Sequence, residues 1–235
     1  MYTKIYELRY SDYKDFDTVK VSSVLDIVQE VSTSHSTHLG YGIDKLRSLG
    51  VAWLIKGINV HFDKEVSTRY PLEASTAVKA TKAATSERGC IIRQNGEVVA
   101  KTIASWFLFD AESQRIAKIS PEMQSAYPIH DFGDEFFSYK KPALIADAPK
   151  VYTIRVCNKE IDTNMHLNNQ KSAELLMDAL PFDYSFDDIK ILYKKPALLG
   201  EELDVCAKET PNGYYVHLRS ADGDICVAGT FEKEN

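Results

Sequence analysis

The sequence lacks the features that would place the protein in a membrane or on nucleic acid. No apolar run among its 235 residues approaches the roughly 18 residues of a membrane-spanning helix. Positive charge is not in excess: the formal net charge is −6, which argues against broad binding to nucleic acid, because such binding requires a basic surface. The first ten residues alternate apolar and charged side chains, unlike a signal or transit peptide. A cytoplasmic protein is expected.

Cysteine is scarce, and its spacing is uninformative about metals. The four cysteines lie far apart and contain no C-x-x-C pair, so neither a zinc site nor a disulfide framework is expected. They are predicted to be small buried apolar side chains: Cys90, Cys157, Cys206 and Cys226.

Several common catalytic motifs are also missing. The chain contains no G-x-S-x-G, which argues against Ser-His-Asp hydrolysis, and no G-x-G-x-x-G or P-loop for nucleotides. His35 and His38 stand three residues apart on a predicted helix and could share a metal ion, but no third ligand is evident. Neither a metal nor a cofactor is expected.

What the sequence does contain is a dense polar cluster ahead of a helix. Within eight residues it places a carboxylate, an imidazole and three amides: Asp162, Asn164, His166, Asn168 and Asn169. An apolar helical run follows and stops at Pro181. Because each of these polar groups would need a partner if buried, the cluster suits a polar site at the start of a helix.

The pattern of predicted elements repeats in the two halves. Each half runs strand, helix and four strands, and an N-G or D-G dipeptide, the preferred pair for a tight hairpin turn, precedes the final strand. The first half has strands at 4–10, 51–62, 70–82, 84–94 and 97–110, with a helix from about 22 to 39. The second has strands at 151–156, 187–195, 201–209, 213–220 and 224–231, with a helix at 168–180. This order indicates duplication.

One helix and a mostly antiparallel sheet can bury each other if the sheet curls around the helix, the layout called a hotdog. The sequence therefore predicts an α+β fold, a tandem double hotdog. Residues 1–119 form the N-terminal hotdog and residues 150–235 the C-terminal one. Between them, residues 120–149 are interrupted by prolines and keep no period, so they are predicted to be a linker on the surface.

The polar cluster also carries a resemblance to a known family. D-T-N-M-H-L-N-N (162–169) matches the D-x-N-x-H-x-N-N signature of the acyl-acyl carrier protein thioesterases of plant plastids and bacteria, which are double-hotdog hydrolases. Other segments resemble that family in the right order: Q-E-V-S-T-S-H (29–35), A-W-L-I (52–55), A-S-W-F (104–107) and R-I-A-K-I-S-P-E (115–122).

The resemblance implies hydrolysis of the thioester of a fatty acyl-acyl carrier protein, releasing free fatty acid. The C-terminal half would carry the chemistry and the N-terminal half would shape the acyl pocket. One departure matters: plant members carry an acid just after a Y-[RK]-[RK] strand, whereas here Pro196 follows Lys195. An acyl-CoA thioesterase and a non-catalytic acyl-binding hotdog are the alternatives, and a dehydratase of this fold fits the signature less well.

Thioester hydrolysis needs an activated water or a carboxylate nucleophile, together with donors for the oxyanion. Asp162 would activate water or attack the carbonyl itself, and His166 would position the water and pass a proton to the thiolate. Asn164 would orient the thioester. The helix start at Asn168 and Asn169 offers backbone N–H groups to the oxyanion, although both are also ordinary capping residues.

Further candidates are less specific. Glu174, two turns into the helix, is a second possible acid. The acyl pocket is expected to include Val28, Val31, Trp53, Ile55 and Ile58, unless these are plain core. An acidic carrier protein needs local cations, and the candidates, each of which could instead be ordinary solvated surface, are Lys140, Lys141, Lys194 and Lys195. The sequence leaves open the preferred chain length and whether two chains pair as a homodimer.

Overall fold

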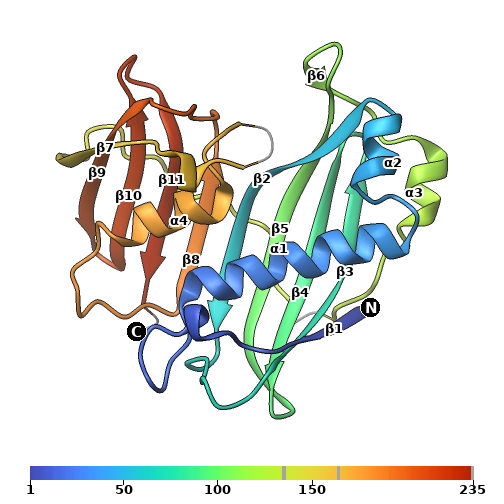
Figure 1. Cartoon of the computed structure of the whole chain (residues 1–235), viewed down its shortest axis with the longest axis horizontal. Coiled ribbons are helices and arrows are strands. Elements are labelled where there is room, and N and C mark those ends of the chain that lie inside the picture. The colour runs from blue at the N-terminus through green and yellow to red at the C-terminus, as the bar shows by residue number, and fades with distance from the viewer. Residues whose placement is uncertain (134–135, 163–164, 234–235) are drawn as a thin grey trace. The chain divides into compact units, whose positions relative to one another are not determined.

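The computed structural model describes residues 1–133, 136–162 and 165–233. The chain forms two compact units, Met1–Tyr139 (unit 1) and Lys140–Asn235 (unit 2) (Figure 1). The residues that were predicted to be a linker, 120–149, are thus divided between the two units. None of the helices in the described ranges has the length and apolar character of a membrane span.

Unit 1 is an antiparallel sheet with one long helix, α1 (Val21–His38), against it. Its strands lie in the order β1-β3-β4-β5-β2, and the short β6 pairs with the end of β5. The bounds are β1 (Tyr2–Tyr6), β2 (Val51–Phe62), β3 (Leu72–Lys82), β4 (Thr85–Gln94), β5 (Glu97–Asp110) and β6 (Arg115–Ile116). A 3-10 turn (Tyr10–Asp12) and two short helices, α2 (Ile43–Ser48) and α3 (Pro121–Ala126), complete the unit.

Unit 2 repeats this arrangement with a shorter helix, α4 (Asn169–Met177). Its strands lie in the order β7-β9-β10-β11-β8, which matches β1-β3-β4-β5-β2 position by position. The bounds are β7 (Lys150–Arg155), β8 (Asp188–Tyr193), β9 (Glu202–Thr210), β10 (Gly213–Ser220) and β11 (Ile225–Glu232), with a 3-10 turn at Asn158–Glu160. The predicted order of elements is confirmed in both halves, and the shared strand order supports duplication.

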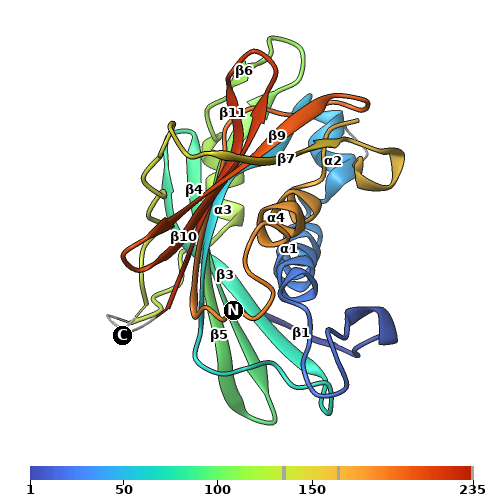
Figure 2. The same ribbon diagram turned by 90° about the vertical axis from the view of Figure 1, so that its left-hand side faces the viewer.

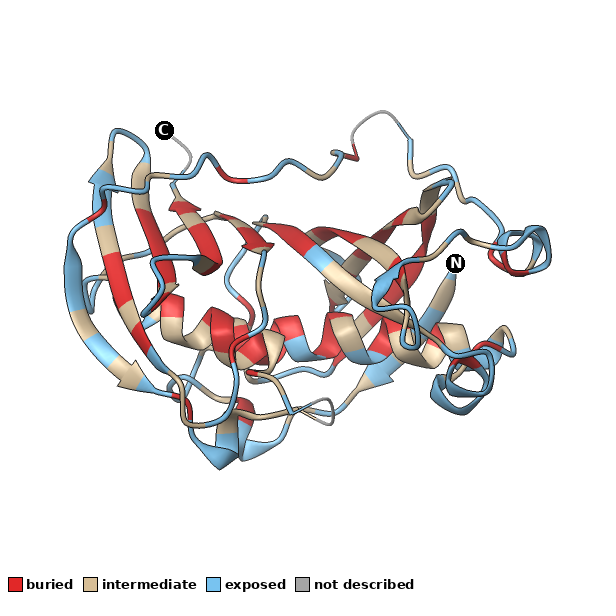
Figure 3. Ribbon diagram, turned by 90° about the horizontal axis from the view of Figure 1, so that it is seen from above, coloured by how far each residue is buried: buried red, intermediate tan, exposed pale blue. Residues whose placement is uncertain are grey.

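Each helix buries one apolar stripe on its sheet. In α1 the buried residues recur three or four apart, the spacing of one helical face, as in Val24, Val28, Val31 and His35. Figure 2 shows α1 against one face only of the unit 1 strands, and Figure 3 shows buried and exposed residues alternating along it. In unit 2 the fully buried Leu176 reaches the sheet at Gly229, where an added Cβ would lie 3.1 Å from Leu176 Cδ1.

A β-bulge in β2 decides which side chains face α1. The pairing with β5 skips Lys56, so Ile55 lies opposite Trp106, and Ile58 lies opposite Ala104. Trp106 and Ala104 alternate onto the same face, so Ile55 and Ile58 share that face in spite of their odd spacing. Simple alternation would have placed them on opposite faces.

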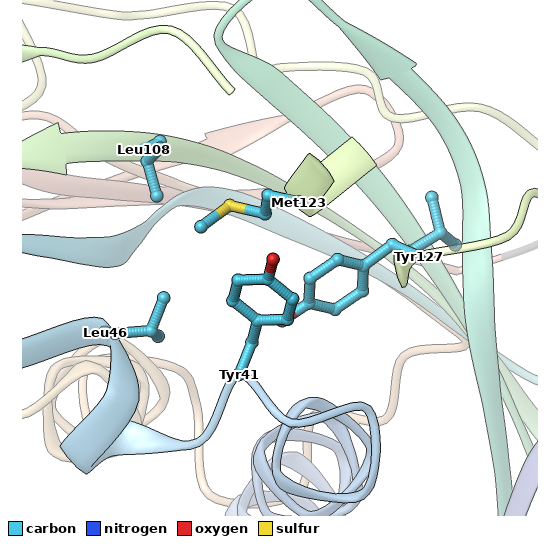
Figure 4. Packing of buried hydrophobic residues seen from close by; sticks show 6 residues of the cluster. Tyr41, Leu46, Leu108, Met123 and Tyr127 are labelled. Carbon is cyan, nitrogen blue, oxygen red and sulfur yellow. The ribbon is translucent and has the colours of Figure 1, made fainter. Parts of the chain in front are cut away.

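At one end of unit 1, α2 and α3 build a second apolar cluster. Its buried members are Tyr41, Leu46, Val78, Leu108, Met123 and Tyr127, five of which are labelled in Figure 4. The start of α3 is well specified, because the Ser120 hydroxyl accepts from Met123 N–H and proline occupies the first turn. Ser-Pro-Glu at 120–122 is a helix-start signal that the prediction of a linker overlooked.

The rest of the predicted linker covers the sheet faces that turn away from the helices. The chain crosses the edge of unit 1 where His130 N–H donates to Val78 O, and Phe132 and Phe136 then pack over Gly89. In unit 2, Ala148 packs on the corresponding face of the sheet with Tyr215, Cys206 and Ala228. Phe136 and Ala148 are buried, so the prediction of a surface segment does not hold at these two residues, because each sheet has an apolar outer face that the chain covers.

Two smaller expectations also need correction. Three cysteines are buried as predicted, but Cys157 is exposed, because it lies two residues beyond the end of β7 and caps a 3-10 turn. The Asn95-Gly96 turn is a two-residue hairpin with both φ angles positive, as expected. Asp222-Gly223 instead belongs to a three-residue loop, in which Ser220 N–H donates to Asp224 O and Gly223 has φ of +86°.

Candidate active site

The polar signature forms a closed turn. Asp162 N–H donates to His166 O at 2.8 Å, and His166 N–H donates back to Asp162 Oδ1 at 3.2 Å. Within the turn, Met165 has φ of +63°, a left-handed conformation that costs a residue other than glycine about 1–3 kcal/mol. Ile161 and Leu167 pair on either side as an antiparallel bridge. The turn therefore holds the Asp162 carboxylate against the backbone N–H of His166.

Asn164 lies outside the described residues, as does Thr163. The predicted role of Asn164 in orienting the thioester therefore stays a prediction. The residues on both sides of it are described, and both Asp162 and His166 are half-buried. A polar cluster with access to solvent is consistent with a site that admits a substrate.

The start of α4 is capped by the signature itself. Asn168 Oδ1 accepts from the N–H groups of Gln170 and Lys171, at 2.9 and 3.3 Å. These two amides, which an oxyanion could otherwise have used, are therefore occupied. Of the three first-turn N–H groups, that of Asn169 has no hydrogen-bond acceptor among the described residues. Asn169 O accepts from Tyr193 Oη at 3.2 Å, which ties α4 to the end of β8.

The position of the missing family acid lies next to the signature. Leu167 N–H donates to Ala197 O at 2.8 Å, and His166 pairs with Leu198 across an antiparallel bridge. Sequence reasoning passed over Glu201, a few residues further on, whose carboxylate accepts from Leu198 N–H at 2.7 Å. An acid directly after the turn glycine Gly200 was the available signal. In the described structure Glu201 closes this turn beside His166.

Glu174, the second predicted acid, is engaged on the surface of α4. Its carboxylate accepts from Lys171 Nζ at 2.7 Å, and both side chains are partly exposed. Near the end of the helix, burial and then the charge of Glu174 raise the pKa of Asp178. The structure thus places Glu174 in an ion pair rather than in a hydrogen bond with a described signature residue.

All five predicted pocket residues face the space between α1 and the unit 1 sheet. Val28 and Val31 come from α1, and the bulge at Lys56 brings Ile55 and Ile58 onto the α1 side of β2. Trp53 lies on the same face, and its ring meets that of Tyr127 edge-on with centroids 6.3 Å apart. Their shared orientation is what the predicted acyl pocket requires, and the pocket itself stays a prediction.

The predicted docking lysines differ from one another. Lys140, Lys141 and Lys194 are exposed. Lys195 Nζ lies 2.8 Å from Asp224 and 3.9 Å from Asp222, and the hydrogen bond that it donates to Asp224 is the main cause that raises the pKa of Lys195. Lys195 could therefore contact a partner only by exchanging an existing one.

The two histidines of α1 do not form a metal site with their described neighbours. Arg88 Nη1 lies 2.7 Å from His35 Nδ1, and the Tyr2 ring stacks on His35 with centroids 5.4 Å apart. Tyr2 also contacts the exposed His38, with centroids 5.3 Å apart. Within the described part of the chain, no three histidine, cysteine or acidic side chains gather to hold a metal ion.

Two family models match this chain. The family model for the acyl-ACP thioesterase N-terminal domain matches residues 1–127, and the model for the acyl-ACP thioesterase C-terminal domain matches residues 145–229. The chain belongs to the acyl-ACP thioesterase family. The second match contains the whole signature turn and the segment beside it, so the family assignment covers the candidate site.

Individual relatives of the family are distant. Oleoyl-acyl carrier protein thioesterase 1, chloroplastic, of Arabidopsis thaliana is 20% identical over 182 residues, which cover 70% of this chain and 50% of that protein. The chain spans about half the length of the curated relatives it matches.

Solved structures of family members share the fold. An acyl-ACP thioesterase from Bacteroides thetaiotaomicron superposes with a TM-score of 0.88 at 14% identity, covering 99% of this chain and 97% of that one. The 12:0-ACP thioesterase from Umbellularia californica gives 0.84 at 13% identity, covering 98% and 95%. At such identities the likeness concerns the fold alone.

Proposed function

We propose that this protein hydrolyses the thioester of fatty acyl-acyl carrier protein and releases the free fatty acid. The observation that carries the proposal is the signature turn at the start of α4, inside a chain whose two halves both match the thioesterase family. The turn brings Asp162 and His166 together at the start of a helix, and a carboxylate, an imidazole and free helix N–H groups are what hydrolysis of a thioester requires.

The same proposal describes the fold as a tandem double hotdog. Each unit has one main helix on an antiparallel sheet, and the two sheets share one strand order. Unit 2 carries the signature and hence the chemistry. Unit 1 supplies the acyl pocket between α1 and its sheet, where Val28, Val31, Trp53, Ile55 and Ile58 gather.

In the proposed reaction, Asp162 activates a water molecule or attacks the thioester carbonyl, and His166 delivers a proton to the leaving thiolate. Asn164 orients the reacting groups, and Asn169 N–H donates to the oxyanion at the positive end of α4. Pro196 supplies no acid, so Asp162 performs the carboxylate's role. Glu201, whose carboxylate accepts from the N–H of Leu198, the bridge partner of His166, is an alternative acid to test.

The proposal is tested with Asp162→Asn and His166→Ala. Each is expected to lower thioester hydrolysis by at least roughly 10²-fold, the scale of general acid–base catalysis, while circular dichroism and thermal unfolding stay native. Glu174→Gln is the matched control, since its carboxylate pairs with Lys171 on the surface. Near-native rates in folded Asp162→Asn would remove Asp162 from the mechanism, and Glu201→Gln would then be examined.

Two alternatives remain, and one assay separates them. The exposed Lys140, Lys141 and Lys194 favour an acidic carrier protein over CoA, so kcat/KM should be higher for acyl-acyl carrier protein than for acyl-CoA of equal chain length. A reversed preference would favour an acyl-CoA thioesterase. The absent family acid is the argument for a non-catalytic acyl-binding protein, which would bind both substrates and release no fatty acid from either.

A further inference from the structure

A buried arginine in unit 1 has no acidic partner among the described residues. Arg88, on the α1 face of β4, is 7% exposed, and among the described residues no carboxylate lies within ion-pair distance of it. Burial lowers the pKa of Arg88 to about 10, so it remains charged at neutral pH. An unpaired buried charge typically costs several kcal/mol. A fold tolerates this cost when something else compensates the charge.

His35 holds the arginine but does not neutralise it. Arg88 Nη1 donates to His35 Nδ1 at 2.7 Å, so this nitrogen carries no proton. Burial and then the neighbouring Arg88 charge lower the pKa of His35 to about 4, which keeps the imidazole neutral. The stacked ring of Tyr2 fixes the plane of the imidazole. The hydrogen bond to His35 therefore orients the guanidinium of Arg88, but His35 supplies no negative charge.

Three further polar groups near Arg88 lack partners. The indole N–H of Trp106 and the hydroxyls of Tyr127 and Thr102 are buried, with no hydrogen-bond partner among the described residues. Trp106 N–H can only donate, and a hydroxyl can donate as well. Each unpaired group normally costs about 1–3 kcal/mol. Three orphan groups beside an uncompensated cation indicate a missing acceptor of hydrogen bonds.

The sheet register gathers these groups. Arg88 lies opposite Ala104, and on β5 the residues two before and two after Ala104 are Thr102 and Trp106, on the same face. Such diagonal neighbours lie within reach of long side chains. The Arg88 guanidinium carbon lies 5.8 Å from the centre of the Tyr127 ring, which Figure 4 shows beside Tyr41. The residue opposite Arg88, Ala104, has only a methyl side chain.

We propose that Arg88, Trp106, Tyr127 and Thr102 bind the carboxylate of an aliphatic acid between α1 and the unit 1 sheet. A carboxylate offers the acceptor oxygens and the negative charge that this cluster lacks, and a guanidinium can bind it with two parallel hydrogen bonds. Trp53, Ile55 and Ile58 line the same face for the apolar chain. The aliphatic nature of the ligand rests on the proposed function; the anion site rests on the cluster alone.

The carboxylate has two possible sources. It is the head group of a free fatty acid, which is the product of the proposed reaction, or the distal carboxylate of an acyl chain derived from a dicarboxylic acid. The first source makes the site one of product inhibition, and the second makes it a determinant of substrate specificity.

Binding can be measured without turnover, because both tryptophans of the chain, Trp53 and Trp106, lie on this face. Decanoate, decanol and methyl decanoate are titrated against tryptophan fluorescence. The native protein is expected to bind decanoate at least tenfold more tightly than either neutral ligand. Arg88→Met should abolish this preference while leaving decanol affinity unchanged. Arg93→Met, on the same strand but facing Glu73 on the other side, should retain it.

Stability separates a binding role from a structural one. Removing an unpaired buried charge should leave the melting temperature of ligand-free Arg88→Met unchanged or raise it. If Arg88→Met does not fold, Trp106→Phe and Tyr127→Phe decide, each lowering the preference for decanoate several-fold. Equal affinity of the native protein for decanoate and decanol overturns the proposal, as does a preference retained in Arg88→Met or in both phenylalanine variants.

Kinetics then assign the source. Inhibition of turnover by decanoate near its dissociation constant, lost in Arg88→Met, identifies the product acid. A higher kcat/KM for the half-thioester of decanedioic acid than for the decanoyl thioester, reversed in Arg88→Met, identifies the distal carboxylate. If no thioester is hydrolysed at all, the proposed function fails, whereas the fluorescence result for the anion site stands.

Discussion

Among single residues, two buried histidines make the fold sensitive to acid. His217 on β10 is fully buried between Cys206 and Ala228, and neither of its ring nitrogens has a partner among the described residues. Burial and then Arg219 lower its pKa to about 4, as burial and Arg88 do for His35. Both imidazoles are neutral in the fold but bind protons in the unfolded chain below about pH 6.5.

His217→Leu is therefore expected to flatten the dependence of stability on pH. As pH falls from about 6.5 towards 4, His217 binds a proton in the unfolded chain but stays neutral in the folded protein. The free energy of unfolding therefore falls with pH. Between pH 7.5 and 5.0 this residue should account for about 2 kcal/mol of that loss. Urea unfolding at both pH values measures the difference. The exposed His38→Leu serves as a control, and an unchanged pH slope in His217→Leu would contradict the assignment.

At the scale of elements, two glycines with positive φ have different reasons to be glycine. Gly213 starts β10 with φ of +148°, and a Cβ there would lie 2.1 Å from Phe231 O and 2.3 Å from Tyr184 Oη. Tyr184 Oη donates to that same carbonyl at 3.0 Å. Gly223, in the loop before β11, has φ of +86° and open space around it. Only the first position combines conformation with a steric demand.

Gly213→Ala is expected to destabilise the protein more than Gly223→Ala. Gly223→Ala should lower the free energy of unfolding by about 1 kcal/mol, the cost of alanine in a left-handed conformation. The first must also part β10 from β11 or break the Tyr184 hydrogen bond, which adds about 1–3 kcal/mol of overpacking. Thermal or urea unfolding of the two variants compares them directly. Equal losses of unfolding free energy in the two variants would contradict this prediction, because they would show that β10 and β11 accommodate the added methyl group without destabilisation.

For the molecule as a whole, charge should govern the encounter with an acidic carrier. The chain is itself acidic, with a net charge of −6, so attraction depends on exposed local cations. Lys140, Lys141 and Lys194 provide these in unit 2, the unit that carries the signature turn. Exposed charges act at a distance of about 10 Å at 0.1 M salt and less at higher salt.

The double variant Lys140→Glu/Lys141→Glu is expected to raise KM for acyl-acyl carrier protein several-fold at low ionic strength, with kcat nearly unchanged. The difference from the native protein should shrink as salt is added, because screening weakens interactions between exposed charges. Steady-state kinetics at 25 and 300 mM salt test this. Lys82→Glu, an exposed lysine of unit 1, is the control. A native KM in the double variant would exclude these two lysines from docking.

Local sequence patterns predicted most of the strands and helices, but not the segments that cover the outer faces of the sheets. Alternation and helical spacing placed most strands and the two main helices to within a few residues, since each pattern is set by side chains close together in the chain. The first strand was placed too late, at 4–10, whereas it is Tyr2–Tyr6. The path of residues 127–149 could not be predicted this way. Phe136 and Ala148 are buried, and Phe132 is half-buried, against strands far away in sequence, so their neighbours along the chain give no periodic sign of this burial.

By itself the sequence determined the order of elements, their duplication and the signature from Asp162 to Asn169. These features depend on residue type and on spacings of a few residues, both of which can be read from the sequence. The tertiary structure alone decided the bulge at Lys56, which brings Ile55 and Ile58 onto one face, and the register that sets Arg88 among Thr102, Trp106 and Tyr127. Register is a property of two paired strands. Pairing across the sheet can therefore bring together the residues of a charged site that cannot be predicted from any one segment.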